Sequence, residues 1–298
     1  MAQEQALAIG PLGTASHDSW VVRLRRTAAH KPVGAVAAIV LLFVAVVSAL
    51  APITAPYDPL ELAVGPSVGA PSMRHWFGTD ELGRDLLSRI IWGGQISMTV
   101  SLVSVFIGKG IGALLGIMSA FYQGTIIDKA IQWLTDVLLA LPVLVMAMAV
   151  VAVLGASLIN VIGAISFTLI PSGVRVIRSQ ALSVMRNQYI DGARAVGAGD
   201  WRLMLLHVMP NCFAPFIIII SGSLGTAILA ETSLSFLGLG VPPPFPTWGG
   251  MLSGGGRTYM TTAIWMAFAP GLVITFVILG FNVLGDALRD TLDPRLRQ

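Results

Sequence analysis

Long uncharged runs of apolar residues dominate the chain, and their lengths predict membrane-spanning helices. Such runs occupy residues 33–51, 137–174, 212–230 and 258–285. A helix needs about 20 mainly apolar residues to cross the hydrocarbon core of a bilayer. The run 137–174 is long enough for two helices, which we expect to divide at the Gly155-Ala156-Ser157 break.

A further apolar stretch, 90–127, is interrupted by one charge, Lys109. Two spans do not fit there, because Lys109 lies between Gly108 and Gly110 with no room for a turn. We therefore expect one long or tilted span at about 96–121, preceded by an interfacial helix. The Lys109 amine either snorkels towards the cytoplasmic interface, which the flanking glycines favour, or belongs to an intramembrane site for an ion or substrate.

The prolines in and near these runs refine the expected helix ends. Pro142 and Pro171 are expected near helix ends, where proline is tolerated. Pro270 is expected to kink the last span.

Composition places these helices in lipid. The chain has 298 residues, of which 55% are hydrophobic and 11% charged, whereas soluble domains carry roughly 25% charged residues. The first run follows Arg23, Arg25, Arg26 and Lys31, as in a signal peptide, but its 19 residues exceed the 7–15 of a signal sequence. We expect an uncleaved first span and an all-α integral membrane protein with about six spans. The net charge of +3 is too small to indicate nucleic-acid binding.

The distribution of basic residues predicts the orientation in the membrane. The expected parts are an N-terminal tail (1–32), a first span (33–51), a Pro-rich extracytoplasmic connector (52–89), a core with five spans (90–285) and a C-terminal tail (286–298). With the N-terminus inside, 13 of the 18 lysines and arginines fall in cytoplasmic segments and four fall outside. Cytoplasmic loops are enriched in Lys and Arg. We therefore expect a multi-pass protein with both termini in the cytoplasm.

The cytoplasmic segment 187–211, between the fourth and fifth spans, predicts a helix–turn–helix. Tyr189, Ala193 and Val196 recur at helical spacing, and Gly197 then breaks the helix together with Gly199. Asp200 is expected to N-cap a second short helix, which Pro210 would stop. On these residues alone, the segment is either an amphipathic anchor on the membrane surface or a docking element.

The spacing within this segment resembles the EAA loop of ABC importer permeases. That pattern is Glu-Ala-Ala, three residues, Gly, and about eleven residues to Leu-Pro. Here the corresponding residues are Asp191, Gly192, Ala193, Gly197 and the Met209-Pro210 pair, so Asp replaces Glu, Gly192 replaces an Ala and Met replaces Leu. The resemblance implies that these residues, together with Asp200, form the loop on which ATPase subunits dock, with Gly197 making a tight turn at close approach to a partner.

Three further segments resemble the "C"-type permeases of dipeptide, oligopeptide and nickel importers. They are FGTDELGRDLLSRIIWGG (77–94), AILAETSLSFLGLGVPPPFPTWGGML (227–252) and FNVLGDALRDTLDPRLR (281–297), so the likeness covers about 70–298. It implies the type I importer permease fold, a bacterial inner membrane location and one half of a translocation pathway. The implied partners are a second permease, two cytoplasmic ATPases that use ATP and Mg, and an extracytoplasmic binding protein. No cofactor bound directly by this chain is implied. Dipeptides, longer peptides, glutathione-like peptides and nickel complexes remain open as substrates.

An ATP-independent transporter or channel and an intramembrane enzyme are the two alternative classes of function. No G-x-x-x-x-G-K-[ST] phosphate loop occurs, so an ABC system would draw its energy from another chain. An ATP-independent transporter or channel needs ionisable groups in its spans, and Lys109 is the one candidate. An intramembrane enzyme is disfavoured because His17, His30, His75 and His207 all lie outside the expected spans.

Several single residues have two readings each. Ser221 and Ser223, with neighbouring glycines, either line the pathway or allow close helix packing, which is favoured because small residues dominate membrane helix interfaces. Glu231, at the outer end of the fifth span, either faces the pathway or caps the following helical segment, which is favoured. Trp248 is either an interfacial residue of a rigid loop or part of a lid facing the binding protein. Cys212 is expected to be a packing residue.

The connector carries four charges close together before the second span. Asp80, Arg84, Asp85 and Arg89 are expected to form a local ion-pair network on the outer surface. We assign it a structural role rather than direct contact with a substrate.

Overall fold

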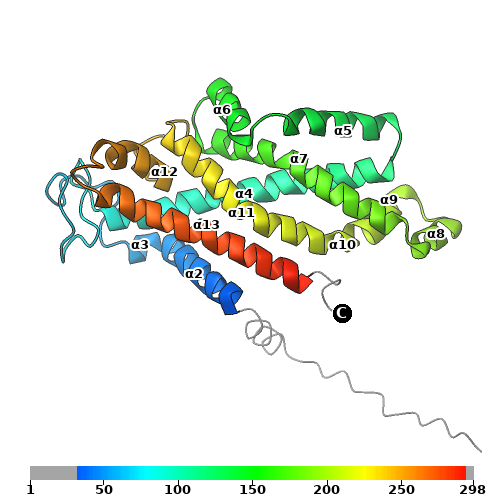
Figure 1. The fold of residues 1–298 in the computed structure, drawn as a ribbon, viewed down its shortest axis with the longest axis horizontal. Helices are drawn as coiled ribbons and strands as arrows, with labels where there is room; N and C mark the ends of the chain where they lie inside the picture. The colour runs from blue at the N-terminus through cyan, green and yellow to red at the C-terminus, as the bar shows by residue number, and fades with distance from the viewer. Residues whose placement is uncertain (1–31, 293–298) are drawn as a thin grey trace, which may run out of the picture.

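The computed structural model describes residues 32–292, and helices make up nearly all of its regular structure (Figure 1). Within these residues there is no β-strand, and an isolated bridge pairs Thr79 with Asp85. The longer helices are α2 (Pro32–Ala49), α4 (Leu86–Phe121), α5 (Ile126–Leu139), α6 (Val143–Leu154), α7 (Leu158–Met185), α11 (Phe213–Phe236) and α13 (Trp265–Leu292). The shorter ones are α3 (Ala51–Thr54), α8 (Gln188–Ala195), α9 (Asp200–Arg202), α10 (Met209–Asn211) and α12 (Trp248–Met251), with π-helical turns η1 (Leu203–Val208) and η2 (Leu252–Gly256).

Five of the described helices, α2, α4, α7, α11 and α13, are long and apolar enough to cross a membrane. The pair α5–α6 makes a sixth crossing if it counts as one broken span. The prediction of an all-α membrane protein with about six spans is therefore confirmed. The predicted basic tail, including His17 and His30, lies outside the described residues.

The centre of the bundle is the parallel pair α4 and α7, which approach closely because glycines line their contact. A Cβ atom added at Gly112 would lie 2.6 Å from the carbonyl oxygen of Ile170 and 3.0 Å from the Cα atom of Gly173. One added at Gly116 would lie 2.8 Å from the carbonyl oxygen of Val174. Small residues of this kind let membrane helices pack backbone to backbone. The α4–α7 contact thus depends on the absence of side chains at these positions.

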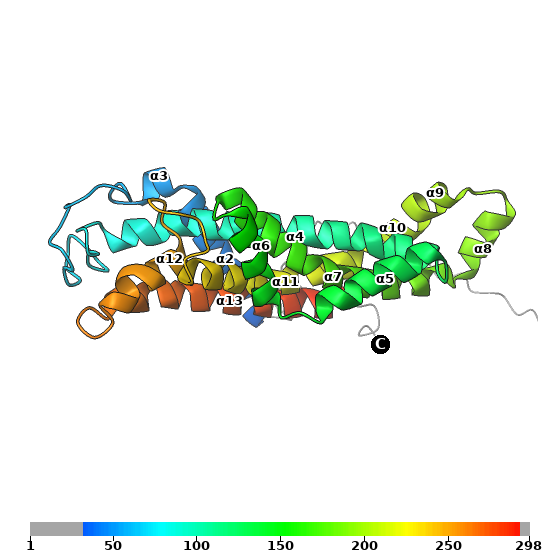
Figure 2. The same ribbon diagram turned by 90° about the horizontal axis from the view of Figure 1, so that it is seen from above.

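The helices α11, α13 and α2 lie beside this pair (Figures 1 and 2). Gly285 of α13 lies against Gly222 of α11, where an added Cβ atom would be 3.2 Å from the Cα atom of Gly222. On α2, Ile39 and Phe43 leave 67% and 66% of their surfaces exposed. Apolar side chains so exposed on a spanning helix face lipid or another membrane chain.

The two ends of the elongated bundle carry different segments (Figures 1 and 2). Residues 55–85 and 237–264, including α12, gather at one end, which we call the connector end. The segment 186–212, with α8 and α9, projects at the other, which we call the loop end. The connector and the loop predicted to dock a partner are therefore on opposite sides of the membrane-spanning region.

The predicted second span proved longer than expected. The Asp85 carboxylate accepts a hydrogen bond from the Ser88 backbone N–H at 2.8 Å, which caps the helix, and α4 then runs 36 residues without interruption. The separate interfacial helix expected before residue 96 is therefore wrong, because the capped start and the apolar sequence continue one helix. At about 1.5 Å per residue α4 measures roughly 54 Å, longer than a hydrocarbon core of about 30 Å.

The predicted third span is not one straight helix. Its sequence is divided between α5 and α6, which are bent by 95° at the break after Leu139. Pro142 lies at the N-cap of α6, and proline disfavours helical backbone in the residue before it. Pro142 is thus at a helix end, as expected.

The other predicted boundaries also moved outwards. Pro171 lies inside α7, which continues to Met185, so its expected place near a helix end is wrong. The helix α11 extends to Phe236, six residues beyond the predicted end of its span. Pro270 lies inside α13, as expected, and that helix continues to Leu292, into the predicted tail 286–298.

Candidate functional site

The segment 186–212 at the loop end is a pair of short helices joined by a glycine turn. The helix α8 ends at Ala195, and Gly197 follows with a φ of +86°. Side chains with a Cβ rarely adopt this conformation, whereas glycine does so readily. The chain then re-enters helical backbone at Asp200 and remains helical through η1 to Asn211. The predicted helix–turn–helix is therefore present in the structure.

An apolar cluster anchors this segment to the bundle. Ile190 of α8 and Leu203 of η1 are each 1% exposed, and they pack with Ile117 of α4 and Ile177 of α7. The guanidinium of Arg194 lies 5.9 Å from the ring centroid of Phe121, within the range of a cation–π contact. The segment is thus joined firmly to the C-terminal ends of α4 and α7, so its displacement would move those helices.

The opposite surface of the segment is apolar and uncovered. The most exposed large side chains are Val196 at 86%, Trp201 at 66% and Leu206 at 62%. The site residues predicted from the sequence lie on this uncovered side or at its edge: Asp191, Gly192, Gly197, Asp200, Met209 and Pro210 are exposed, and Ala193 is half-buried. Contiguous exposed apolar residues beside polar ones mark an interaction surface.

Two local expectations for this segment are wrong, although the predicted first helix is present as α8, with Ile190 as its buried residue. Asp200 is the first residue of α9 rather than its N-cap, which is Gly199; its carboxylate still lies at the positive end of a helix.

Pro210 was expected to stop the second helix, but it does not. It lies in the first turn of α10, where its missing N–H costs little, and the backbone remains helical to Asn211. At Gly197 an added Cβ atom would meet nothing within 4 Å, so the close approach expected there involves no other part of the described chain.

The hydroxyls of Ser221 and Ser223 bond to the backbone of their own helix, α11. The hydroxyl of Ser221 donates to the Ile218 carbonyl at 2.9 Å, and that of Ser223 donates to the Ile219 carbonyl at 2.6 Å. Ser221 is 5% exposed and Ser223 is half-buried. Gly225 leaves room for Asn282 of α13, whose Oδ1 atom would be 2.8 Å from an added Cβ. The packing interpretation therefore accounts for the contacts of Ser221 and Gly225.

Glu231 does not cap a helix, contrary to expectation. It lies inside α11, is 0% exposed, and its Oε1 atom accepts a hydrogen bond from the Ser235 hydroxyl at 2.8 Å. Its Oε2 atom has no hydrogen-bond partner among the described residues. Glu231 is therefore a core carboxyl group of α11, closed off from any pathway in this conformation.

Trp248 is likewise a core residue rather than an interfacial one. It is 0% exposed, and its indole Nε1–H donates to the carbonyl of Ile90 on α4 at 2.9 Å. Gly94 makes room for the ring, since an added Cβ there would lie 2.9 Å from the indole Cζ2 atom. The helix α12 is thus inserted between α4 and α11 at the connector end. The repeated glycines of both segments (Gly93-Gly94 and Gly249-Gly250) are the sequence signal for this close approach.

Lys109 does not snorkel. It is 3% exposed, and its ammonium group donates to the Leu169 carbonyl at 3.2 Å and to the Ser172 hydroxyl at 2.5 Å, both on α7. No carboxylate pairs with it in the described chain. Lys109 therefore ties α4 to α7, and of its flanking glycines Gly108 serves the helix contact, whereas Gly110 faces away from α7.

The charged network of the connector is present, with one change of partner. Asp80 pairs with Arg84 at 2.7 Å and with Arg89 at 3.4 Å. Asp85 pairs instead with His75, whose Nδ1 atom is 2.9 Å from its Oδ1 atom. Asp80 and Arg89 are 6% and 8% exposed, so the network is buried and not on the surface as expected. His75 was not distinguished in the sequence, because its partner is ten residues away in irregular backbone.

A second buried network escaped the sequence analysis. Arg178 of α7 pairs with Asp128 of α5 at 3.0 Å, and its Nε–H donates to the Ser119 hydroxyl of α4 at 2.9 Å. These residues join three helices near the loop end. Arg178 is 59 positions from Ser119 and 50 from Asp128, so no local sequence pattern indicates their contact.

Comparison with known proteins shows the family to which this chain belongs. The model of the family described as binding-protein-dependent transport system inner membrane component matches residues 112–298. The chain belongs to this family. It is a multi-span inner membrane permease of the ABC importer class, as the resemblance of its motifs implied, and works with ATPase and substrate-binding components.

The relatives include permeases named for peptide substrates. The di/tripeptide transport system permease protein DppC of Pseudomonas aeruginosa is 43% identical over 271 residues, which are 89% of each chain. The glutathione transport system permease protein GsiD of Escherichia coli is 40% identical over 282 residues, 94% of this chain and 91% of the other.

A solved structure of the MetNI methionine ABC transporter in an inward-facing conformation has the same fold. Its matching chain superposes with a TM-score of 0.56 at 16% identity, over 70% of this chain and 98% of that one.

Proposed function

We propose that this permease forms half of a translocation pathway for small peptides. The observation that supports this substrate class is the identity of about 40% to permeases named for di/tripeptides and glutathione, over about nine-tenths of both chains. The other half of the pathway comes from a second, related permease. An extracytoplasmic binding protein delivers the peptide at the connector end.

The segment 186–212 is the element on which a cytoplasmic ATPase docks. It is anchored by Ile190 and Leu203 to the ends of α4 and α7, and it presents Val196 and Trp201 uncovered. An ATPase that grips this surface would transmit its own closure to the spanning helices. Two ATPase subunits supply ATP and Mg chemistry, and both termini of this chain lie in the cytoplasm with the docking segment.

The test is reconstitution of the complete transporter in proteoliposomes. Uptake of labelled dialanine should require the binding protein, the second permease and ATP together. Uptake by this chain alone, driven by an ion gradient, would contradict the proposal and establish an ATP-independent transporter. ATP-driven uptake of a nickel complex without peptide uptake would contradict the substrate class alone.

Substitution of Gly197 tests the docking role. We expect Gly197→Asn to retain most ATP-driven uptake, because Asn tolerates a positive φ better than other side chains do. Gly197→Trp should abolish uptake, because an indole would fill the open space beside the turn. The measurement is uptake together with co-purification of the ATPase subunits. Full uptake by Gly197→Trp would show that no partner approaches there.

A further inference from the structure

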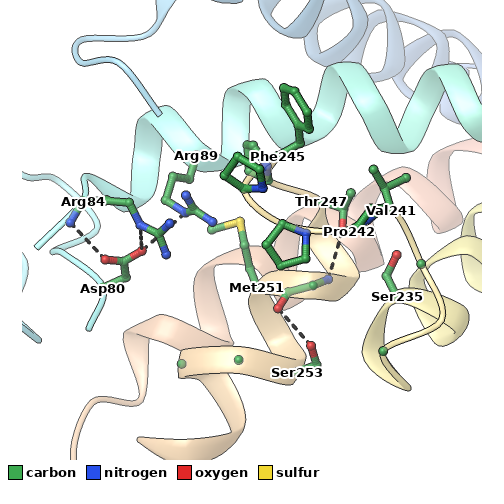
Figure 3. A pocket seen from close by; sticks show the side chains of 18 of the residues that line it. Asp80, Arg84, Arg89, Ser235, Val241, Pro242, Phe245, Thr247, Met251 and Ser253 are labelled. Atoms are coloured by element: carbon green, nitrogen blue, oxygen red, sulfur yellow. Dashed lines mark hydrogen bonds and ion pairs between the residues drawn. The ribbon is translucent and has the colours of Figure 1, made fainter. Parts of the chain in front are cut away.

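A cavity of about 330 Å³ lies at the connector end, between the first turn of α4 and the segment 237–255 (Figure 3). This volume is within the range of small-molecule sites, roughly 300–1,000 Å³. One wall carries the charges of the connector, and the facing wall is formed by the proline-rich loop and α12. None of the site residues described above explains this cavity.

The innermost charges of the cavity already have partners. The Oδ1 atom of Asp80 accepts hydrogen bonds from the backbone N–H groups of Leu82 and Arg84, and its Oδ2 atom accepts one from Arg84 Nε–H. Arg89 donates through Nη1 to the Pro59 carbonyl at 2.9 Å. Asp80 and Arg89 therefore hold the connector against α4 and have little capacity left for a ligand.

Two charged groups at the cavity have capacity left. Arg84 uses its Nε atom for Asp80, whereas its Nη2 atom is 4.0 Å from Glu81 Oε1, beyond hydrogen-bond distance. The Glu81 side chain is 35% exposed and makes no closer ion pair among the described residues. A guanidinium edge and a carboxylate thus lie side by side, each with unused hydrogen-bonding positions. The Arg84 side chain is 12% exposed, so Glu81 is the more open of the two groups.

The rest of the cavity is apolar. Val241, Pro242, Phe245, Met251 and Met266 are among its lining residues. Phe245 is drawn beside Arg89 and above Met251 (Figure 3). Phe245 is 58% exposed. This wall offers a surface for an apolar side chain beside the two charges.

We propose that the cavity is a peptide-binding subsite at the outer mouth of the permease, recognising a zwitterionic peptide by both of its termini. Glu81 takes the α-ammonium group, Arg84 takes the α-carboxylate, and the proline-rich wall holds an apolar side chain. Inserting a zwitterion between two opposite charges leaves the net charge of the cavity unchanged, so neither terminus is buried without a partner. This inference rests on the proposed peptide substrate.

Direct binding to the whole permease–ATPase complex in nanodiscs, without binding protein, tests this subsite. The probes are Ala-Phe, its N-acetylated form and its C-terminal amide, titrated by calorimetry. We expect Ala-Phe to bind and each blocked form to bind at least about tenfold more weakly, since a hydrogen bond to a charged group contributes roughly 1.5–3 kcal/mol. Equal binding of all three peptides, or no binding of Ala-Phe, would overturn the proposal.

Substitutions then assign the two roles. Glu81→Gln should weaken binding of Ala-Phe about tenfold and remove the preference over the N-acetylated form, while preserving the preference over the amide. Arg84→Lys keeps the charge near Asp80 but loses the planar fork, and it should reduce the preference over the amide. The matched control is Glu61→Gln, a change of an exposed carboxylate on the same connector but outside the cavity, which should leave all three affinities unchanged.

Uptake separates failure of this inference from failure of the proposed function. If the wild-type transporter with its binding protein takes up no peptide, the substrate class is wrong. If it takes up Ala-Phe and Glu81→Gln changes neither uptake nor binding, the subsite alone is wrong. A Glu81→Gln variant that loses affinity for the binding protein but not for Ala-Phe would also overturn the subsite, since the cavity would then receive a protein side chain.

Discussion

Trp248 joins three segments at the connector end of the protein. Its ring is enclosed by α4, its indole N–H bonds the Ile90 carbonyl, and its backbone N–H donates to the Ser97 hydroxyl at 3.3 Å. The adjacent Gly249 lies against α11, with the carbonyl oxygen and Cα atom of Thr232 nearest to it. Trp248 and Gly249 together thus fix the position of α12 relative to both helices.

We expect Trp248→Ala to destabilise the permease by about 3–5 kcal/mol, the range for removing a large buried aromatic side chain. The matched control is Trp76→Ala, because Trp76 is 69% exposed at the same end and its removal should cost no more than about 0.5 kcal/mol. Thermal unfolding of the purified complex measures both. Similar unfolding midpoints for the two variants would contradict the enclosed position of Trp248.

For Lys109 we expect the opposite: its substitution should not destabilise the permease. Its ammonium group is buried against neutral acceptors, and burying a charge without an opposite charge costs free energy that an apolar side chain of similar length does not. Lys109→Met should therefore retain uptake within about twofold, with an unchanged or higher unfolding midpoint. Lys129→Met, at an exposed lysine of α5, is the control. Loss of uptake by an intact Lys109→Met complex would instead assign Lys109 a role in transport.

Among whole elements, α4 and α7 make the most extensive helix–helix contact in the described chain. The glycines at 108, 112 and 116 recur every four residues on α4 and so face one side of that helix. Gly110 lies between them on another face, where an added Cβ atom would meet nothing within 4 Å. The same helix therefore contains both constrained and unconstrained glycines.

Alanine substitution separates the two kinds of glycine. Gly112→Ala should destabilise by about 1–3 kcal/mol, because its methyl group would press on the backbone of α7. Gly110→Ala should stabilise by about 0.4–1 kcal/mol, since alanine restricts the unfolded chain and meets no obstacle. Unfolding midpoints of the two variants that shift in the same direction would contradict this packing.

The sequence predicts the bounds of a helix well where the interactions that set them are local. The apolar run 33–51 predicted α2 to within two residues, since a span near a chain end needs little beyond its length. The start of α4 was missed by ten residues because it depends on a hydrogen bond from Ser88 to Asp85. The bend between α5 and α6 was not predicted, because Pro142 indicates a helix end whether the third span is one straight helix or a bent pair.

The same distinction holds for the candidate site. The turn at Gly197 and the polar edge of the segment 186–212 follow from residue type, and these were predicted. The burial of Ile190 and Glu231 depends on contacts with helices distant in the sequence. The pairing of His75 with Asp85 spans ten residues of irregular backbone, where residue spacing does not indicate a contact. The cavity beside Glu81 combines residues from before the second span and after the fifth, which no local pattern brings together.

At the scale of the whole molecule, orientation in the membrane is open to a labelling test. Cys212 is the one cysteine and is 3% exposed, so a Cys212→Ala background is suitable. Met73→Cys at the connector end should react with an impermeant maleimide on spheroplasts. Val196→Cys at the loop end should react only after lysis, in cells that lack the ATPase subunits. The reverse pattern would place the docking segment outside the cytoplasm.

The length of α4 has a mechanical consequence. One uninterrupted helix begins beside the outer cavity and ends beside the anchor of the segment 186–212. A stiff rod of roughly 54 Å that tilts by about 10° moves one end by roughly 9 Å relative to the other, close to the diameter of a helix. With an ATPase docked as proposed, the helix would act as a lever arm, and a small rotation imposed at the loop end would widen or close the mouth at the connector end.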